Sequence, residues 1–200
     1  MVALKLASER GIPVYLSTVL TKHNASEESI DFLVRLAREY KIKVGIIILQ
    51  NVMETTGNVS QILAGDNQYR VAIQKIIREI DNGAPILFSK KSYEHVLRWP
   101  NYSKVRLNKK DQEVHQVNGP KCWGGRFFCN IDSNGDVYPC CLTIGSLKPL
   151  NFLENGFEKS WEHIQQHSCR TCMSPGWTDY NYVFSLDPQV LWHHIRTPIV

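Results

Sequence analysis

Hydrophobic positions in the first hundred residues alternate between two spacings. Apolar runs rich in β-branched residues occupy 12–20 (IPVYLSTVL) and 43–49 (KVGIIIL), and a shorter run spans 85–88. Runs of this length predict strands, and the continuously apolar ones predict strands that are buried on both faces. Between the runs, apolar residues return every three or four positions, which predicts helices, and a polar loop is expected at 51–66. Strands that alternate with helices predict crossover connections and a parallel sheet.

The helices of this half have recognisable ends. The segment 2–10 (VALKLASER) has a helical apolar face and is followed by a glycine, the residue typical of a helix C-terminus. Asn24 and Glu27 have the spacing of a capping box and predict the start of a second helix. A third helix is predicted through 69–80, stopped by an Asn-Gly pair, and a fourth at about 92–99.

The number of strands limits the architecture. A closed parallel barrel needs about eight strands over roughly 250 residues. The two or three strands predicted here are too few, and the chain starts inside a helix that nothing precedes. The sequence is therefore expected to form an α/β structure that corresponds to the back half of a larger one.

The second half of the chain has a different pattern. Residues 101–121 are polar and contain an Asn-Gly-Pro loop sequence, which predicts a linker. Strands are predicted at 126–132 and 136–139, joined by Ser-Asn-Gly, because Asn and Gly adopt the positive φ that a hairpin turn requires. A short helix is expected at 157–166, and a last helix is expected to start at Pro188.

Composition and charge exclude several classes of protein. The chain has 200 residues, 43% of them hydrophobic and 21% charged, as expected for a globular protein. The net charge is only +4, and Lys/Arg residues are scattered except for Lys104, Arg106, Lys109 and Lys110, which we interpret as a solvated segment. Charged residues interrupt any signal-peptide core, and no apolar run approaches the roughly 18 residues of a membrane span. We therefore expect a cytoplasmic protein that binds neither nucleic acid nor a membrane.

Six cysteines carry the clearest candidate chemistry. In a reducing compartment, cysteines are more often metal ligands or buried thiols than disulfides. Cys169 and Cys172 are separated by two residues, a spacing that lets both sulfurs point to one zinc ion or iron–sulfur cluster. The predicted hairpin folds Cys122 and Cys140 toward the same end of the ribbon. Cys122, Cys140, Cys169 and Cys172 are thus the predicted ligands of one four-thiolate site.

The other two cysteines and the nearby aromatic residues have simpler interpretations. Cys141 could replace its neighbour Cys140 as a ligand. Cys129 lies on the predicted hairpin strand and is expected to be a small buried hydrophobic residue. Aromatic residues concentrate around the cysteines, where they can bury area or exclude water from a metal centre: Trp123, Phe127, Phe128, Trp161, Trp177, Tyr180 and Tyr182.

Histidines offer a competing metal site. His163 and His167 are four residues apart on a predicted helix, so their rings would share one face. Together with Cys169 and Cys172 they could bind zinc, although this arrangement leaves the hairpin cysteines unexplained. The adjacent pair His193-His194 is expected to face solvent on the last helix, because neighbouring residues do not share a helix face.

The spacing of the cysteines resembles that of a known family. Twelve residues separate Cys122 from Gly135, four separate Gly135 from Cys140, and C-x2-C follows after a gap. Together with the text CWGGRFFCNIDSNGDVYPC, this pattern is similar to the auxiliary-cluster region of radical S-adenosylmethionine enzymes, the SPASM and Twitch domains. No cysteine follows Cys172, so the shorter Twitch form is the closer match. The resemblance implies that Cys122, Cys140, Cys169 and Cys172 ligate one [4Fe-4S] cluster.

The first half resembles the same family in LSTVLTKHNASEESIDFLVRLAREYKIKVGI, which looks like the later strands and helices of its partial (β/α)6 barrel. The implied fold class is α/β: the second half of a partial parallel (β/α) barrel over 1–100, a linker over 101–121, and a cysteine-rich β-hairpin plus helix domain over 122–200. In intact relatives, cleavage of S-adenosylmethionine makes a radical that abstracts a substrate hydrogen.

One departure from the family limits the expected activity. The C-x3-C-x2-C loop that holds the S-adenosylmethionine-cleaving cluster is not in the sequence. S-adenosylmethionine would therefore be a cofactor only if a missing N-terminal half were supplied, and we expect this chain alone to be inactive. A separate N-terminal half or an electron donor is the expected partner. The hypotheses from another class are a zinc-stabilised α/β binding domain and a non-enzymatic iron–sulfur electron carrier, which metal analysis would distinguish.

Overall fold

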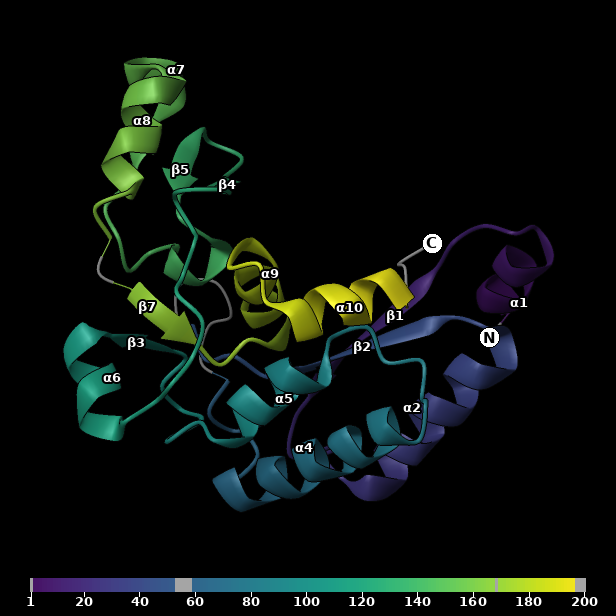
Figure 1. The fold of residues 1–200 in the computed structure, drawn as a ribbon. Helices are drawn as coiled ribbons and strands as arrows, with labels where there is room; N and C mark the ends of the chain where they lie inside the picture. The colour runs from purple at the N-terminus through teal and green to yellow at the C-terminus, as the bar shows by residue number, and fades with distance from the viewer. Residues whose placement is uncertain (1, 53–58, 168, 197–200) are drawn as a thin grey trace.

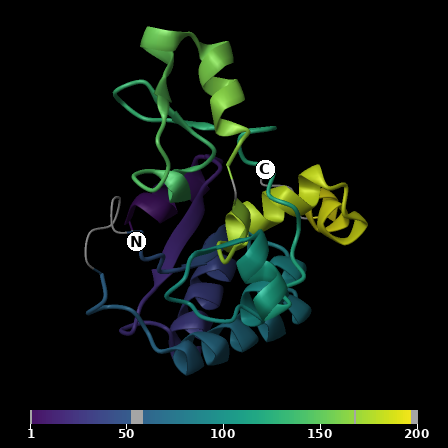
Figure 2. The same cartoon turned by 90° about the vertical axis from the view of Figure 1, so that its left-hand side faces the viewer.

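The computed structural model describes residues 2–52, 59–167 and 169–196. It is a mixed α/β fold in which the strands of the described residues form small parallel and antiparallel sheets and no closed barrel. A parallel strand pair and the long helices form a broad base, and a smaller part with α7, α8, β4 and β5 stands upright at one end (Figures 1 and 2). In the described part of the chain, no helix is both long enough and apolar enough to cross a bilayer.

The base alternates strands and helices as the hydrophobic pattern predicts. Its elements are α1 (Val2–Glu9), β1 (Tyr15–Leu20), α2 (Glu27–Tyr40), β2 (Lys43–Ile48), α4 (Asp66–Asp81) and α5 (Lys90–Leu97). β1 and β2 pair in parallel, from Tyr15 opposite Lys43 to Leu20 opposite Ile48. The predicted run at 85–88 adds a single parallel bridge between Ile86 and Val44. The predicted polar loop at 51–66 lies partly outside the described residues, at 53–58.

The start of α2 differs from the prediction. Ser26 is the N-cap, and its side chain accepts a hydrogen bond from a backbone N–H of the first turn. Asn24 instead holds the turn that leaves β1, because its Oδ1 accepts from the Thr21 N–H at 2.6 Å and its Nδ2 donates to the Val19 carbonyl at 3.1 Å. The predicted capping box of Asn24 and Glu27 is therefore wrong, and the observed N-cap lies two residues after the expected one.

The second half contains more regular structure than predicted. Its elements are β3 (Arg106–Asn108), α6 (Lys109–His115), β4 (Asn130–Ile131), β5 (Asp136–Tyr138), η1 (Cys141–Thr143), β6 (Leu150–Asn151), α7 (Phe152–Asn155), α8 (Phe157–Ile164), β7 (Cys169–Cys172), α9 (Pro175–Phe184) and α10 (Pro188–Arg196). The predicted hairpin is confirmed as β4 and β5, and β6 adds a third antiparallel strand. The first strand is shorter than predicted, because residues around Gly125, whose φ is +74°, form a turn.

The segment predicted as a linker, 101–121, is folded. It contains β3 and α6, and β3 pairs antiparallel with β7, so that Arg106 lies opposite Cys172. α6 begins with a capping box between Asn108 and Asp111. A three-residue strand has too short a hydrophobic pattern to be recognised, and its partner lies far along the chain. The absence of regular structure expected there is therefore wrong.

One hydrophobic core extends through both halves. It includes residues of the base such as Leu20 and Ile76, together with Leu107, Leu142 and Met173 from the cysteine-containing half. Burial of each such side chain stabilises the fold by about 1.5–3 kcal/mol. The segments that carry the cysteines are thus packed directly against the parallel part.

Candidate metal centre

Four cysteines on three segments of the chain interact electrostatically with one another. Cys169 and Cys172 lie at the two ends of β7. Cys122 reaches them from the loop before the hairpin, where its backbone N–H donates to the Arg170 carbonyl at 3.0 Å. Cys140 lies just after β5, as the N-cap of η1. Each of these four thiols interacts electrostatically with the other three.

The four thiols differ in exposure. Cys140 and Cys172 are buried, at 7% and 6% exposure, and face the core. Cys122 and Cys169 are partly exposed and form the solvent side of the group. A centre held here would therefore be covered on one side and reachable from the other.

Backbone amides point at three of the sulfurs in the same way. Cys122 accepts a hydrogen bond from the Gly124 backbone, Cys140 from the Leu142 backbone, and Cys172 from the Ser174 backbone. In each case the donor is the N–H two residues after the cysteine. Hydrogen bonds of this kind favour the thiolate over the thiol and are one of the means by which proteins tune iron–sulfur clusters.

Two side chains of α9 add further hydrogen bonds. The Asn181 side chain interacts with the Cys122 sulfur, and its Oδ1 also accepts from the Trp123 N–H at 2.8 Å. The Thr178 hydroxyl interacts with the Cys172 sulfur and donates to the Cys172 carbonyl at 3.2 Å. The sequence did not point to these residues, because α9 buries polar side chains and lacks a helical hydrophobic pattern.

The thiol pKa values describe how protons are shared in the metal-free site. The Cys122 sulfur accepts a hydrogen bond from the Cys169 thiol, which lowers the pKa of Cys122 to about 7. The same hydrogen bond, together with burial, raises the pKa of Cys169. Burial raises the pKa of Cys140 to about 12 and also raises that of Cys172. Metal binding here would release protons from the buried thiols.

Positive charge lies beside the sulfurs. The guanidinium of Arg106, on β3, lowers the pKa of both Cys122 and Cys140 and donates to the Ser146 hydroxyl at 2.7 Å. Arg126 and Arg170 join Arg106 around His167, just before Cys169. These cations would partly balance the negative charge of four thiolates.

The histidine-containing zinc site does not form. Nε2 of His163 is 2.8 Å from the Lys148 carbonyl oxygen, and Nε2 of His167 is 2.7 Å from the Gly124 carbonyl oxygen. α8 ends before His167, so the two rings do not share a helix face. Over the described ranges, no three His, Cys, Asp or Glu side chains, the four cysteines included, are placed to hold a single metal ion.

The two remaining cysteines, Cys129 and Cys141, are both half-buried. Cys141, the first residue of η1, is half-buried and interacts electrostatically with Cys140. Cys129 is half-buried rather than buried, comes just before β4, and has its pKa raised by partial desolvation. Its predicted place on the strand and its full burial are thus both corrected.

Aromatic side chains stack on one another next to the hairpin. Phe128 stacks on Trp177 with ring centroids 4.8 Å apart and lies 5.9 Å from the ring of Phe184. Trp123 stacks on Phe127 at 4.7 Å. These rings come from the cysteine loop and from α9, and Phe128 and Trp177 pack against the core that contains Cys140 and Cys172.

The adjacent histidines of the last helix do not simply face solvent. His194 Nε2 lies 2.6 Å from Oδ2 of Asp179, a carboxylate that is only 2% exposed. His193 Nε2 lies 3.2 Å from the Leu87 carbonyl. The two rings therefore attach α10 to the neighbouring elements, and the prediction that they face solvent is wrong.

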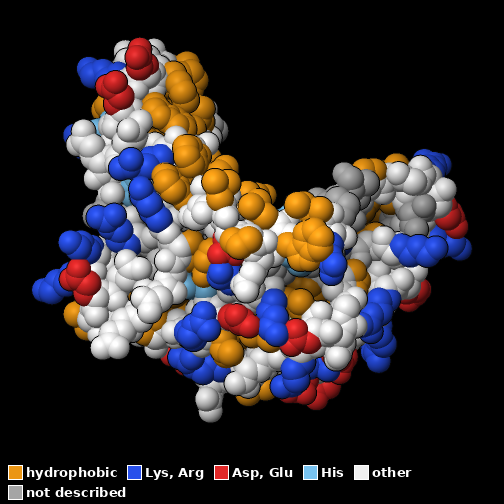
Figure 3. All heavy atoms as spheres, viewed as in Figure 1, with side chains coloured by type: hydrophobic (Ala, Val, Ile, Leu, Met, Phe, Trp, Pro, Cys, Tyr) orange, Lys and Arg blue, Asp and Glu red, His pale blue; other side chains and the backbone are white. Residues whose placement is uncertain are grey.

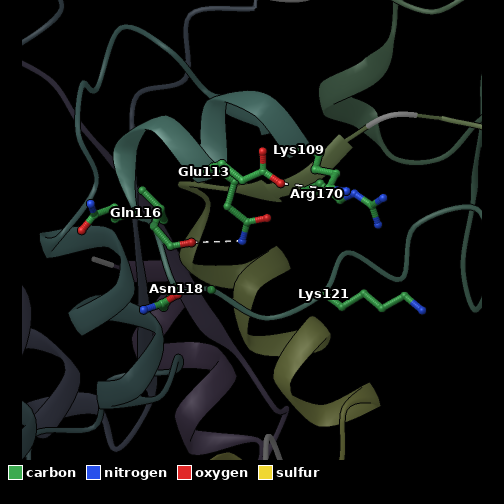
Figure 4. A pocket seen from close by; sticks show the side chains of 9 residues that line it. Lys109, Glu113, Gln116, Asn118, Lys121 and Arg170 are labelled. Atoms are coloured by element: carbon green, nitrogen blue, oxygen red, sulfur yellow. Dashed lines mark hydrogen bonds and ion pairs between the residues drawn. The ribbon is translucent and has the colours of Figure 1, made fainter.

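A recess of about 770 Å³ opens between α6 and the loop that leads to Cys122. Lys109, Lys121 and Arg170 are among its lining residues, and Glu113 lies at its edge, 3.9 Å from Lys109 (Figure 4). Lys121 and Arg170 are each adjacent in sequence to a cysteine of the group. The recess therefore has several cations in its lining.

Searches against protein-family models, curated proteins and solved structures find no match to this chain. The functional interpretation therefore depends on the chemistry of the cysteine site itself.

Proposed function

We propose that this chain is an iron–sulfur protein that binds one [4Fe-4S] cluster through Cys122, Cys140, Cys169 and Cys172. The observation that carries the proposal is the electrostatic interaction among these four thiols, with backbone N–H groups interacting with three of the sulfurs. Four cysteine thiolates are the usual ligand set of such a cluster.

The donor set favours a cluster over a single ion. All four groups are thiols, the ligand type of iron–sulfur clusters. A cluster of several irons spreads its cysteine ligands farther apart than one zinc ion does, so it suits thiols that approach one another from three segments. The aromatic cover and the hydrogen bonds to sulfur are also features that tune cluster potentials.

We further propose that the chain is related to the C-terminal part of radical S-adenosylmethionine enzymes. The parallel strands β1 and β2, with the bridge at Ile86, would be the second half of a partial (β/α) barrel, and the cysteine half would be a Twitch-like domain. A cluster with four protein thiolates has no open iron for S-adenosylmethionine. We therefore assign only an auxiliary cluster to this chain.

The chain's own residues have defined roles in this proposal. When bound, the cluster would supply one-electron redox chemistry. The four cysteines would hold it, and Arg106 would offset its negative charge. The stacked rings of Phe128 and Trp177 would exclude water, and the polar residues of α9 would fix the cysteine sulfurs.

The test is anaerobic reconstitution of the full chain with iron and sulfide. We expect about four irons per chain and a broad absorbance at about 400 nm. Cys169→Ala and Cys172→Ala should each abolish both signals, whereas Cys129→Ala, the matched control, should leave them unchanged. One tightly bound zinc without iron would contradict the proposal, and bleaching by Cys129→Ala would contradict the ligand assignment.

A further inference from the structure

A recess apart from the one in Figure 4 lies where the base meets the cysteine-containing half. It has a volume of about 510 Å³ and is bordered by the loop after β2, the segment 103–108, the first turn of α6 and the loop after η1. Cys169, one of the four thiols, is part of its wall. In parallel α/β proteins, ligands bind at the C-terminal ends of the strands. The end of β2 therefore opens onto a space in which a small molecule can bind.

Arg106 is the cation of this recess that has no ionic partner. Lys104 also lines the recess, but its Nζ is 2.7 Å from Oδ1 of Asp111, another lining residue. The Arg106 guanidinium donates to the Ser146 hydroxyl at 2.7 Å and forms no ion pair with a carboxylate of the described residues. A guanidinium has five N–H donors in a planar fork that matches a carboxylate, so donors remain for a ligand. With two cations and one carboxylate, the lining carries one positive charge in excess.

Asn51 brings an unsatisfied hydrogen-bond acceptor to the same recess. Among the described residues, three buried side-chain N or O atoms lack a hydrogen-bond partner, and two of them belong to the neighbours Gln50 and Asn51, just after β2. Buried polar groups are nearly always paired in native proteins, so an unpaired one calls for a missing partner. Asn51 lines the recess, and its Oδ1 is shielded from solvent in the rotamer that it adopts. Rotation about the permissive Cβ–Cγ bond would present this oxygen to a donor in the recess.

Apolar side chains form the rest of the wall. Val52, Val105 and Leu107 are buried, and Leu147 is half-buried. A ligand that fills the recess therefore needs an apolar body beside its charged group. The single excess positive charge matches one negative charge, which favours a monocarboxylate over a phosphate dianion or a polyphosphate. Figure 3 shows Lys and Arg side chains gathered on the side of the molecule that carries α6 and β7, and this charge attracts anions toward the recess.

We infer that this recess binds a small monocarboxylic acid that has an apolar body and a hydroxyl or N–H donor next to its carboxylate. Arg106 receives the carboxylate, the Asn51 amide oxygen accepts from the donor, and the apolar wall covers the body. The inference goes beyond the proposed function, because neither Arg106 nor Asn51 is a proposed cluster ligand and the binding needs no metal. Since Cys169 is part of the wall, a cluster at the four thiols would lie next to the bound acid.

The experiment is equilibrium dialysis of the full chain against isotopically labelled mandelate and phenylacetate, before and after reconstitution with iron and sulfide. The two acids have the same ring and the same charge and differ by one hydroxyl group next to the carboxylate. The variants are Arg106→Gln and Asn51→Leu, and the matched control is Arg35→Gln, at an exposed position of α2. Urea titration of every variant confirms that it is folded, and iron content is measured in every reconstituted sample.

We expect the wild-type chain to bind mandelate saturably at one site, about tenfold more tightly than phenylacetate, because only mandelate donates to Asn51. Arg106→Gln should weaken the binding of both acids about tenfold or more, since the charged hydrogen bonds to the carboxylate are lost. Asn51→Leu should weaken only mandelate, so that the preference between the two acids disappears. Arg35→Gln should bind both acids as the wild type does, and the pattern should be the same with and without iron.

Several results would overturn the inference. One is the absence of saturable binding of either acid by the folded wild-type chain, and another is an equal loss of binding in Arg106→Gln and Arg35→Gln. An undiminished preference for mandelate in Asn51→Leu would also contradict it, and this variant keeps the test decisive if Arg106→Gln does not fold. Inorganic phosphate that displaces mandelate at lower concentration than phenylacetate does would assign the recess to phosphate groups instead. A chain that binds mandelate as expected but incorporates no iron would support this inference and remove the proposed function.

Discussion

His95 and Cys172 join the two halves of the protein through one buried hydrogen bond. The imidazole Nε2 of His95, on α5, lies 3.1 Å from the carbonyl oxygen of Cys172, at the end of β7. His95 is 1% exposed, and burial lowers its pKa to about 4, so the ring is neutral and donates from Nε2. A helix of the base thus fixes the position of a proposed cluster ligand.

Replacement of His95 should destabilise the fold and the site together. His95→Leu introduces an apolar side chain of similar size and leaves the buried Cys172 carbonyl without its hydrogen-bond donor. This loss should lower the free energy of unfolding by about 2 kcal/mol. We expect this loss in the free energy of unfolding from urea titrations, and a lower iron content after reconstitution. His23→Ala, at an exposed position, is the control and should change neither quantity. Equal stability of the two variants would show that the hydrogen bond does not position β7.

Gly119 should tolerate no side chain. A Cβ built there would lie 2.4 Å from Cε1 of His95 and 2.8 Å from Oγ1 of Thr171, and both of these side chains are buried. Gly119→Ala should therefore cost about 2 kcal/mol or more through overpacking. Gly65→Ala is the control, because a Cβ there meets nothing within 4 Å. This substitution loses only the preference of the N-cap position for Gly over Ala. Equal thermal unfolding temperatures for the two variants would contradict the close packing at Gly119.

Asp179 should make stability depend on acid pH. Burial raises the pKa of this carboxyl, but hydrogen bonds from His194, Ser89 and Ser92 outweigh burial and lower the pKa below 3.8. The folded state therefore binds this proton less readily than the unfolded state. The resulting stability is present above pH 3.8 and is lost as the pH falls through the lower folded pKa.

The corresponding variant is Asp179→Asn. It should be less stable than wild type by about 2 kcal/mol near neutral pH, because hydrogen bonds to a charged carboxylate are replaced by bonds to a neutral amide. Urea titrations should show this difference shrinking below about pH 4. Asp81→Asn, which affects an exposed ion pair with Lys90, should change stability little at any pH. A constant difference between Asp179→Asn and wild type across the pH range would contradict the assigned role of the carboxylate.

Cys122 should be the most easily ionised of the four thiols in the metal-free chain. Its pKa of about 7 predicts that alkylation by iodoacetamide rises with a midpoint near that pH, whereas Cys140, with a pKa of about 12, should react slowly throughout. Peptide mass spectrometry after timed alkylation measures both rates. Cys169→Ala removes the thiol that donates to Cys122 and should move its midpoint upward. An unchanged midpoint in that variant would show that the two thiols do not share a proton.

The part of the fold that the sequence predicts well is the part built from local patterns. Continuously apolar runs predict β1 and β2 because buried parallel strands need no polar face. The Asn-Gly turn predicts the β4–β5 hairpin because few residues adopt its backbone angles. By contrast, β3 is three residues long and is recognised only through β7, its distant partner.

The candidate site is predictable to the same degree. The spacing of the cysteines identifies four thiols, because short spacings constrain where sulfurs point. It does not identify Thr178, Asn181 or His95, which act on the sulfurs and carbonyls from helices that are distant in sequence. Their buried polar side chains also weaken the helical pattern of α9, so this helix was not predicted.

The pairing of β3 with β7 has a consequence for how the protein is made. β3 is synthesised well before β7, and the long chain between them must be placed before the two strands can meet. On a nascent chain, the cysteines of the hairpin region are therefore synthesised before Cys169 and Cys172 are present. If the proposed cluster forms, its full set of ligands is therefore available only after Cys169 and Cys172 have been synthesised and β3 has paired with β7.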